Sequence, residues 1–197
     1  MKKLLIGRKI GMSRFFDENG KVTPVTLIKT AEFKIVAIKK DEEKSLSTIY
    51  VKLAKDFSEL TKENEKDSKK VIARSFTENI ENEYKVGDKI TLDSLDGEKT
   101  IDISTMSKGK GFAGTIKRHH FHRGPKTHGS HNVRQPGSIG AMYPQRVVKG
   151  KKMPGHLGAE RVTIKKVKIV EINKAENFLV VKGSIPGIKN ALVEIKG

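Results

Sequence analysis

The stretch from Ser107 to Arg161 is the feature that most limits what this chain can fold into. It holds all six histidines, 12 of the 40 lysines and arginines, 10 of the 18 glycines and four of the six prolines, but its only acid is Glu160. A segment with so few apolar side chains cannot bury a core that offsets its conformational entropy. Its formal charge of +11 over 55 residues also repels itself. We therefore expect the stretch to lie along a polyanion, for which a phosphate backbone is the usual candidate.

The remaining residues predict a series of short strands, because β-branched and apolar side chains alternate with polar ones between turn signals. Pro24 indicates an edge or bulge position, and Asp96-Gly97 predicts a hairpin turn. Many short strands with few helices favour a small closed β-barrel, so the expected fold is mainly β with a short helix and a long basic loop excursion. The expected strands are 4–6, 10–16, 22–28, 33–39, 47–53, 89–92, 100–103, 162–172, 178–181 and 192–195.

The basic stretch lies between two expected strands, so it is an excursion from the barrel and not a tail. We expect residues 1–106 and 159–197 to form the barrel body and residues 107–158 to form the basic extension. Within the body, residues 51–98 are expected to be a more variable, partly helical insertion. Asp56 to Lys70 is almost wholly charged and is its candidate helix.

Composition narrows the possible partners. A net charge of +17 and a pI near 9.9 favour binding to nucleic acid or to an anionic membrane surface. The chain has no apolar run of about 18 residues, and no amphipathic apolar anchor supports a membrane-surface protein. The absence of cysteine excludes disulfides and thiolate metal sites. The absence of tryptophan argues against the stacking of many bases on aromatic platforms.

Gly109 to Gly114 matches the pattern G-x-G-x-x-G, which invites a dinucleotide-binding interpretation. That interpretation requires an acid about 20 residues later, and Ser130 to Arg134 contains none. The simpler interpretation is a tight glycine turn that opens a short helix, Phe112 to His119. Next to Lys108 and Lys110, such a turn also allows backbone amides to approach a phosphate closely.

The six histidines invite a metal site or a catalytic base. Zinc sites usually combine cysteine, histidine and carboxylate ligands, whereas Glu160 is the only local acid and the neighbouring bases repel a cation. No paired carboxylates and no nucleophile–base spacing stand out. We therefore predict no catalytic residue, no metal and no cofactor. A metal-dependent RNA-processing enzyme that uses the histidines is the alternative function, and it predicts loss of function on chelation.

Ten strings stand out in order along the chain: Ile6–Met12, Phe16–Gly20, Pro24–Thr26, Ser107–Gly114, Lys117–His119, Pro136–Gly140, Lys149–Met153, Gly155–His156, Glu160–Thr163 and Val181–Gly187. The order is interrupted only between about Lys52 and Thr100, where little is diagnostic. Taken together, these strings resemble the bacterial large-subunit ribosomal protein L-three family.

The resemblance implies a translation-protein-like barrel body and an extension inserted into 23S rRNA. It implies a non-enzymatic structural protein of the large subunit in the cytoplasm, which nucleates early assembly and whose loop tip supports the peptidyl transferase centre. The implied partners are 23S rRNA and neighbouring large-subunit proteins, L-fourteen and L-nineteen among them, with no membrane and no homo-oligomer. If Arg123 to Arg161 forms a two-stranded finger, each arm of about 17–19 residues reaches about 50–60 Å at ~3.3 Å per residue.

The predicted site residues follow from this basic stretch and from the resemblance. The run Lys149-Gly150-Lys151-Lys152 has no nearby counter-charge and needs an external anion. The predicted loop tip is Gly137, Ser138, Ile139, Gly140, Ala141, Met142 and Tyr143. The predicted RNA-binding residues are Arg8, Lys9, Lys108, Lys110, Lys117, Arg118, His119, His120, His122, Arg123, Lys126, His128, His131, Arg134, Arg146, Lys149, Lys151, Lys152, His156 and Arg161.

Overall fold

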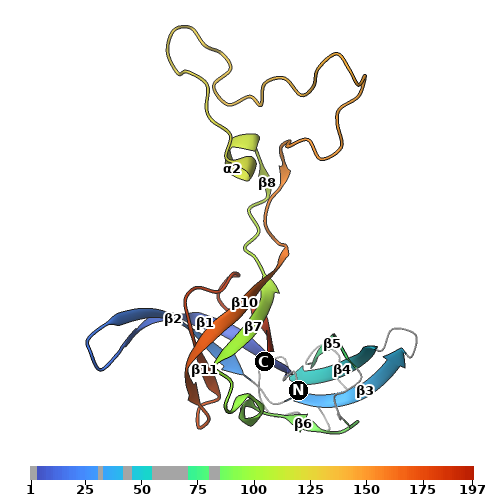
Figure 1. The fold of residues 1–197 in the computed structure, drawn as a ribbon, viewed down its shortest axis with the longest axis vertical. Coiled ribbons are helices and arrows are strands. Elements are labelled where there is room, and N and C mark those ends of the chain that lie inside the picture. Colours follow the sequence, from blue (N-terminus) through green and yellow to red (C-terminus); the bar gives the residue numbers. More distant parts are fainter. Residues whose placement is uncertain (1–3, 31–32, 42–45, 55–70, 80–84) are drawn as a thin grey trace. The chain divides into compact units, whose positions relative to one another are not determined.

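A closed ring of six antiparallel strands forms the body of the protein (Figure 1). The structure is a computed structural model that describes residues 4–30, 33–41, 46–54, 71–79 and 85–197. The expectation of a mainly β fold with a small closed barrel and a short helix is confirmed. Around the ring the strands are β1 (Leu4–Phe16), β12 (Leu192–Lys196), β7 (Thr100–Met106), β10 (Arg161–Asn173), β11 (Phe178–Lys182) and β2 (Val22–Thr30).

A second sheet shares the hydrophobic core of the barrel. Its strand order is β5 (Val71–Asn79), β4 (Leu46–Ala54), β3 (Phe33–Asp41) and β6 (Lys89–Ile90). Leu4, Leu5 and Ile6 are all fully buried, although successive strand side chains point to opposite faces. Both faces of β1 are therefore covered at this point. The same core cluster contains Phe33 and Ile35 of β3, so the second sheet packs against the barrel.

The expected hairpin at Asp96-Gly97 is wrong. Strand β6 pairs with β3 in the second sheet, whereas β7 pairs with β10 and β12 in the barrel. A 3-10 helix, η2 (Leu92–Leu95), connects them, with Leu92 and Leu95 buried. Asp96 is the residue at which η2 ends. Asp-Gly pairs are found at the ends of helical turns as well as in hairpins, so the pair alone did not identify a hairpin.

The expected insertion at residues 51–98 contains more strand than predicted. Strand β5 was not anticipated, and the described part of this region also holds β6 and η2 but no α-helix. The candidate helix Asp56 to Lys70 lies outside the described residues. Strand β2 is not an edge strand, but Pro24 lies one residue beyond the last pair that β2 forms with β11, Val25↔Lys182. Its missing N–H group therefore interrupts no ladder at that point.

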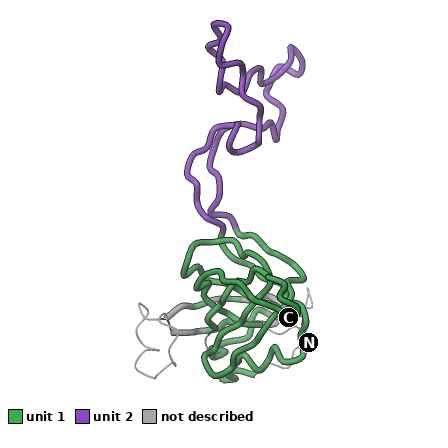
Figure 2. Tube along the Cα trace, turned by 90° about the vertical axis from the view of Figure 1, so that its left-hand side faces the viewer, with its two compact units in different colours: residues 1–106, 161–197 green, residues 107–160 purple. Residues whose placement is uncertain are grey.

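The chain divides into two compact units, residues 1–106 with 161–197 and residues 107–160 (Figure 2). The chain leaves β7 at Met106 and returns to β10 at Arg161, and these two residues are register partners. The second unit, here called the extension, contains β8 (Phe112–Ala113), α2 (Thr115–His119) and β9 (Gly155–His156). The short helix thus begins at Thr115 and not at Phe112, because Phe112 pairs with His156.

The two-stranded finger considered for Arg123 to Arg161 is not formed. Strand pairing in the extension is confined to Phe112↔His156 and Ala113↔Gly155, and residues 120–154, all described, contain no strand. Ala113 and Thr115 are the only buried residues between 107 and 160, which are described throughout. No helix in the described part of the chain is long and apolar enough to cross a membrane.

Candidate nucleic-acid interface

Backbone hydrogen bonds hold the two ends of the extension together as a narrow ribbon, residues 107–113 with 155–160, here called the neck. Ser107 N–H donates to the Glu160 carbonyl at 2.8 Å, Lys110 N–H donates to the Leu157 carbonyl at 2.9 Å, and Leu157 N–H donates to the Gly111 carbonyl at 3.0 Å. A Cβ at Gly158, where φ is +78°, would lie 2.1 Å from the Lys108 carbonyl oxygen. Glycine is therefore required at this position, because the opposite segment of the neck leaves no room for a side chain.

The glycines of the G-x-G-x-x-G pattern belong to the neck and to the turn that follows it. The Lys110 amide is bonded to Leu157 and does not point toward a phosphate, contrary to the expectation for this glycine turn. The next helix is only five residues long, and the glycines allow the ribbon and its turn into α2. The glycines of the pattern therefore allow the backbone conformation of the neck. Lys108 and Lys110 are exposed, and their ammonium groups remain candidate phosphate ligands.

Helix α2 ends against the returning chain. Arg118 Nη1 donates to the Met153 carbonyl at 2.8 Å, and His119 Nε2 lies 2.9 Å from the same oxygen. His120 adopts a left-handed conformation, with φ 60° and ψ 34°, and ends the helix. Two of the predicted RNA-binding side chains thus have a partner inside the extension.

Residues 120–152 form irregular loops with their own short-range hydrogen bonds. Gly124 N–H donates to the Val133 carbonyl at 3.0 Å, and a Cβ at Gly124 would lie 2.5 Å from the Asn132 carbonyl oxygen. Ser138 Oγ donates to the Gly140 carbonyl at 2.9 Å within the predicted tip. Met142 and Tyr143 of that tip are 84% and 73% exposed, which leaves large apolar surfaces open to a partner.

Charge within the extension is almost entirely uncompensated. Glu160 is its single acid, and among the residues that the structure describes none of its lysines or arginines forms an ion pair. The same part of the chain holds no group of three or more histidines, aspartates or glutamates that could bind a metal ion. The structure places the following predicted residues on the extension: Lys108, Lys110, Lys117, Arg118, His119, His120, His122, Arg123, Lys126, His128, His131, Arg134, Arg146, Lys149, Lys151, Lys152 and His156.

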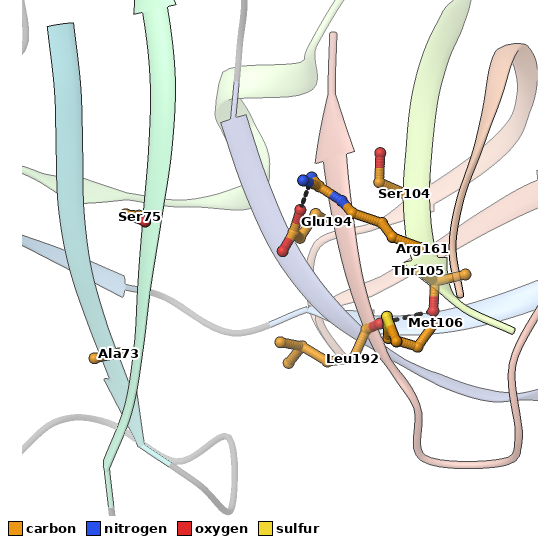
Figure 3. A pocket seen from close by; sticks show the side chains of 8 residues that line it. All are labelled: Ala73, Ser75, Ser104, Thr105, Met106, Arg161, Leu192 and Glu194. Carbon is orange, nitrogen blue, oxygen red and sulfur yellow. Dashed lines mark hydrogen bonds and ion pairs between the residues drawn. The ribbon is translucent and has the colours of Figure 1, made fainter. Parts of the chain in front are cut away.

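The three predicted residues on the body lie in a different setting. Lys9 Nζ donates to the Ile185 carbonyl at 2.6 Å and also lies 3.3 Å from the Gly187 carbonyl. Arg161 forms an ion pair with Glu194 of β12 (Figure 3). Arg8 is half-buried on β1. The RNA contacts of these residues stay predictions, but Lys9 and Arg161 already connect segments of the barrel.

Arg161 and Glu194 line a cavity of about 390 Å³ between the barrel and β5 (Figure 3). Its walls also include Ala73 and Ser75 of β5, and Thr105, whose hydroxyl donates to the Leu192 carbonyl at 2.8 Å. The sequence did not predict Glu194 or the Met153 carbonyl as partners. Glu194 sits in an ordinary alternating strand, and Met153 contributes only its backbone.

A closed barrel that carries an exposed, nearly acid-free basic extension defines a class of protein suited to holding a polyanion. The sequence model of the family described as "Ribosomal protein L3" matches residues 88–177. The "Large ribosomal subunit protein uL3" of Oceanobacillus iheyensis is 40% identical over 99% of this chain and 97% of its own length. The protein of the same name in Carboxydothermus hydrogenoformans is 40% identical over 100% of this chain and 97% of its own length.

A similar relative occurs in Listeria innocua, where the "Large ribosomal subunit protein uL3" is 38% identical over 100% of this chain and 97% of its own length. Identity at this level extends through the body as well as the extension. The chain belongs to the ribosomal protein L3 family of the large ribosomal subunit, a non-enzymatic family, and the resemblance noted in the sequence is confirmed.

Proposed function

We propose that the extension binds 23S rRNA directly. Its lysine, arginine and histidine side chains would contact the phosphates, riboses and nucleobases of the RNA. The observation that carries this proposal is the exposed extension itself, in which one acid faces 11 lysines and arginines and only two residues are buried. Neutralising phosphates releases condensed counterions, which favours binding. A unit without a core gains its order from such a partner.

The proposed ligands are Arg8 on the body and those lysines, arginines and histidines of the extension whose side chains form no hydrogen bond or ion pair within the described part of the chain. Phosphate contacts position a protein and carry no sequence information, so the run at Lys149–Lys152 would anchor the chain. The uncharged tip, Gly137 to Tyr143, would pack between RNA elements and support the peptidyl transferase centre. The proposed ligands are Lys108, Lys110, Lys117, His120, His122, Arg123, Lys126, His128, His131, Arg134, Arg146, Lys149, Lys151, Lys152 and His156, with Arg8 on the body.

In this proposal the protein is a structural constituent of the large subunit of the cytoplasmic ribosome. It joins the subunit early and nucleates assembly, because its extension must enter the RNA before the surrounding RNA closes. Its neighbours would include the large-subunit proteins L-fourteen and L-nineteen. The alternative of a metal-dependent RNA-processing enzyme loses its support, since the family is one of ribosomal structural proteins.

The salt dependence of binding to 23S rRNA fragments tests the proposal. Engagement of about six to ten phosphates predicts a slope of log K against log salt of roughly −4 to −9. Lys151→Ala with Lys152→Ala should reduce the magnitude of that slope by roughly 1.4–1.8.

The matched control is Lys165→Ala with Lys168→Ala, which removes the same charge from two exposed lysines of β10 on the barrel. This control should leave the slope unchanged if the extension is the interface. A slope near zero for the unaltered protein, or an equal loss of slope in both double variants, would contradict the proposal.

A further inference from the structure

The Met153 carbonyl is the point at which the extension closes on itself. It accepts a hydrogen bond from Arg118 at 2.8 Å and lies 2.9 Å from His119 Nε2. A carbonyl oxygen has two lone pairs, so these two donors occupy it fully when His119 carries its proton on Nε2. The two contacts span 35 and 34 residues and therefore join the two ends of the loop 120–152.

Gly155 supplies a second observation at the same place. A Cβ at this position would lie 2.8 Å from Arg118 Nη1 and 3.2 Å from its Cζ, so the guanidinium occupies the space that a side chain would fill. Gly155 is also the register partner of Ala113, two residues before α2. Ala113 and Thr115, the two buried residues of the extension, hold the start of α2. The buried start of α2 therefore fixes the position of Arg118 beside the segment Met153–Gly155.

We propose that Arg118 and His119 are positioning residues that close the base of the loop 120–152 before any RNA is bound, and that they are not phosphate ligands. The effect of this closure on binding rests on the proposed function. A loop whose ends are already fixed loses less conformational entropy when it enters rRNA. Both residues stand in the basic run Lys117-Arg118-His119-His120, so charge alone does not separate them from their neighbours.

Lys117 is the matched neighbour. It is exposed, it lies on the same helix, and no hydrogen bond or ion pair involves its side chain in the described part of the chain. Lys117→Ala and Arg118→Ala each remove one positive charge, but only the second removes a donor to Met153. Gly155→Ala does the reverse: it changes no charge, and its methyl group displaces the flexible end of Arg118.

The first readout is the carbonyl ¹³C resonance of Met153 in the free full-length protein, because this resonance responds to hydrogen bonds at its own oxygen. Arg118→Ala and Gly155→Ala should shift it in the same direction, Arg118→Lys should restore part of the difference, and Lys117→Ala should leave it in place. Amide exchange at Leu157 should accelerate by about tenfold in the first two variants, as the neck loses its support.

The second readout is binding to 23S rRNA fragments at several salt concentrations. Arg118→Ala and Gly155→Ala should both weaken binding, by about tenfold, while the salt slope stays that of the unaltered protein. Lys117→Ala should lower the magnitude of the slope by about 0.7–0.9. If Arg118 is instead a phosphate ligand, Arg118→Ala lowers the slope like Lys117→Ala, and Gly155→Ala leaves affinity unchanged.

An unchanged Met153 resonance in both Arg118→Ala and Gly155→Ala overturns the proposal, whatever the RNA result. If the unaltered protein fails to bind rRNA, the proposed function fails. The Met153 resonance still decides whether Arg118 closes the base of the loop 120–152. Arg118→Ala and Arg118→Lys keep the test valid if Gly155→Ala disturbs the pairing of β8 with β9.

Discussion

Gly7 of β1 is paired with Thr30 of β2, and its position leaves no room for a side chain. A Cβ there would lie 2.4 Å from Ile28 Cγ2 and 3.0 Å from the Lys29 carbonyl oxygen. Gly7→Ala should therefore overpack the barrel and lower the free energy of unfolding by about 1–3 kcal/mol. Chemical denaturation of the purified protein measures this change.

Gly11 on the same strand is the control, because a Cβ at that position would meet nothing within 4 Å. Gly11→Ala should be neutral or stabilising by about 0.4–1 kcal/mol, since alanine reduces the entropy of the unfolded chain. Equal destabilisation by the two substitutions would show that the close contact at Gly7 is not the cause.

At the scale of single residues, the sequence located the basic extension. It did not distinguish lysines and arginines that are exposed from those that bind other groups of the protein. Charge density predicts a polyanion-binding segment, because charge can be counted from the composition alone. The partners of Lys9, Arg118 and Arg161 are backbone carbonyls or a carboxylate that are 33 or more residues away along the chain. Contacts to a backbone atom leave no sequence pattern, so no inspection of the basic run could have identified them.

At the scale of elements, Lys174 links the turn between β10 and β11 to η2. Its ammonium group lies 3.1 Å from Asp93 Oδ1 and also contacts Asp96. The hydrogen bond from Lys174 lowers the pKa of Asp93 below its ordinary value of 3.8. The hydrogen bonds to Asp96 and Asp93 raise the pKa of Lys174 above 10.5.

These shifts predict how Lys174→Met changes stability with pH. The contribution of Asp93 is present above pH 3.8 and is lost as the pH falls through its folded value. The contribution of Lys174 is present below pH 10.5 and is lost as the pH rises through its folded value. The difference in melting temperature between the two proteins should be constant between these limits, shrink beyond them, and decrease with added salt. A difference that stays constant down to the lowest pH tested would exclude the ion pairs as its source.

Secondary-structure elements were predictable where the alternation of side chains decides them. The barrel strands β2, β10, β11 and β12 alternate or form apolar runs, and all were expected. Strand pairing was less predictable, because Asp96-Gly97 resembles a hairpin turn although β6 and β7 belong to different sheets. Leu92 and Leu95 are spaced as one face of a 3-10 helix, a signal too short to recognise in advance.

At the scale of the whole molecule, the two units should differ in how much they contribute to folding. Deletion of residues 134–152, bridged by glycines, removes no buried side chain. The deletion should therefore leave the midpoint of thermal unfolding of the body nearly unchanged. Calorimetry of the purified variant measures this midpoint.

Ile195→Ala is the positive control, because this fully buried side chain of β12 should cost about 2–5 kcal/mol when truncated. If the deletion lowers the midpoint as much as Ile195→Ala does, the segment contributes to the core and the division between body and extension is misplaced.

The position of β12 in the ring has a consequence for synthesis on the ribosome. Strand β12 pairs with β1 on one side and with β7 on the other, so the ring stays open until β12 is in place. A chain made from its N-terminus exposes residues 107–160 well before residues 192–196 emerge. The nascent protein therefore presents its basic extension while β1 and β7 still have bare edges, and such edges are prone to pair with other chains. A polyanion that binds the extension at this stage would therefore bind a protein whose barrel is still open.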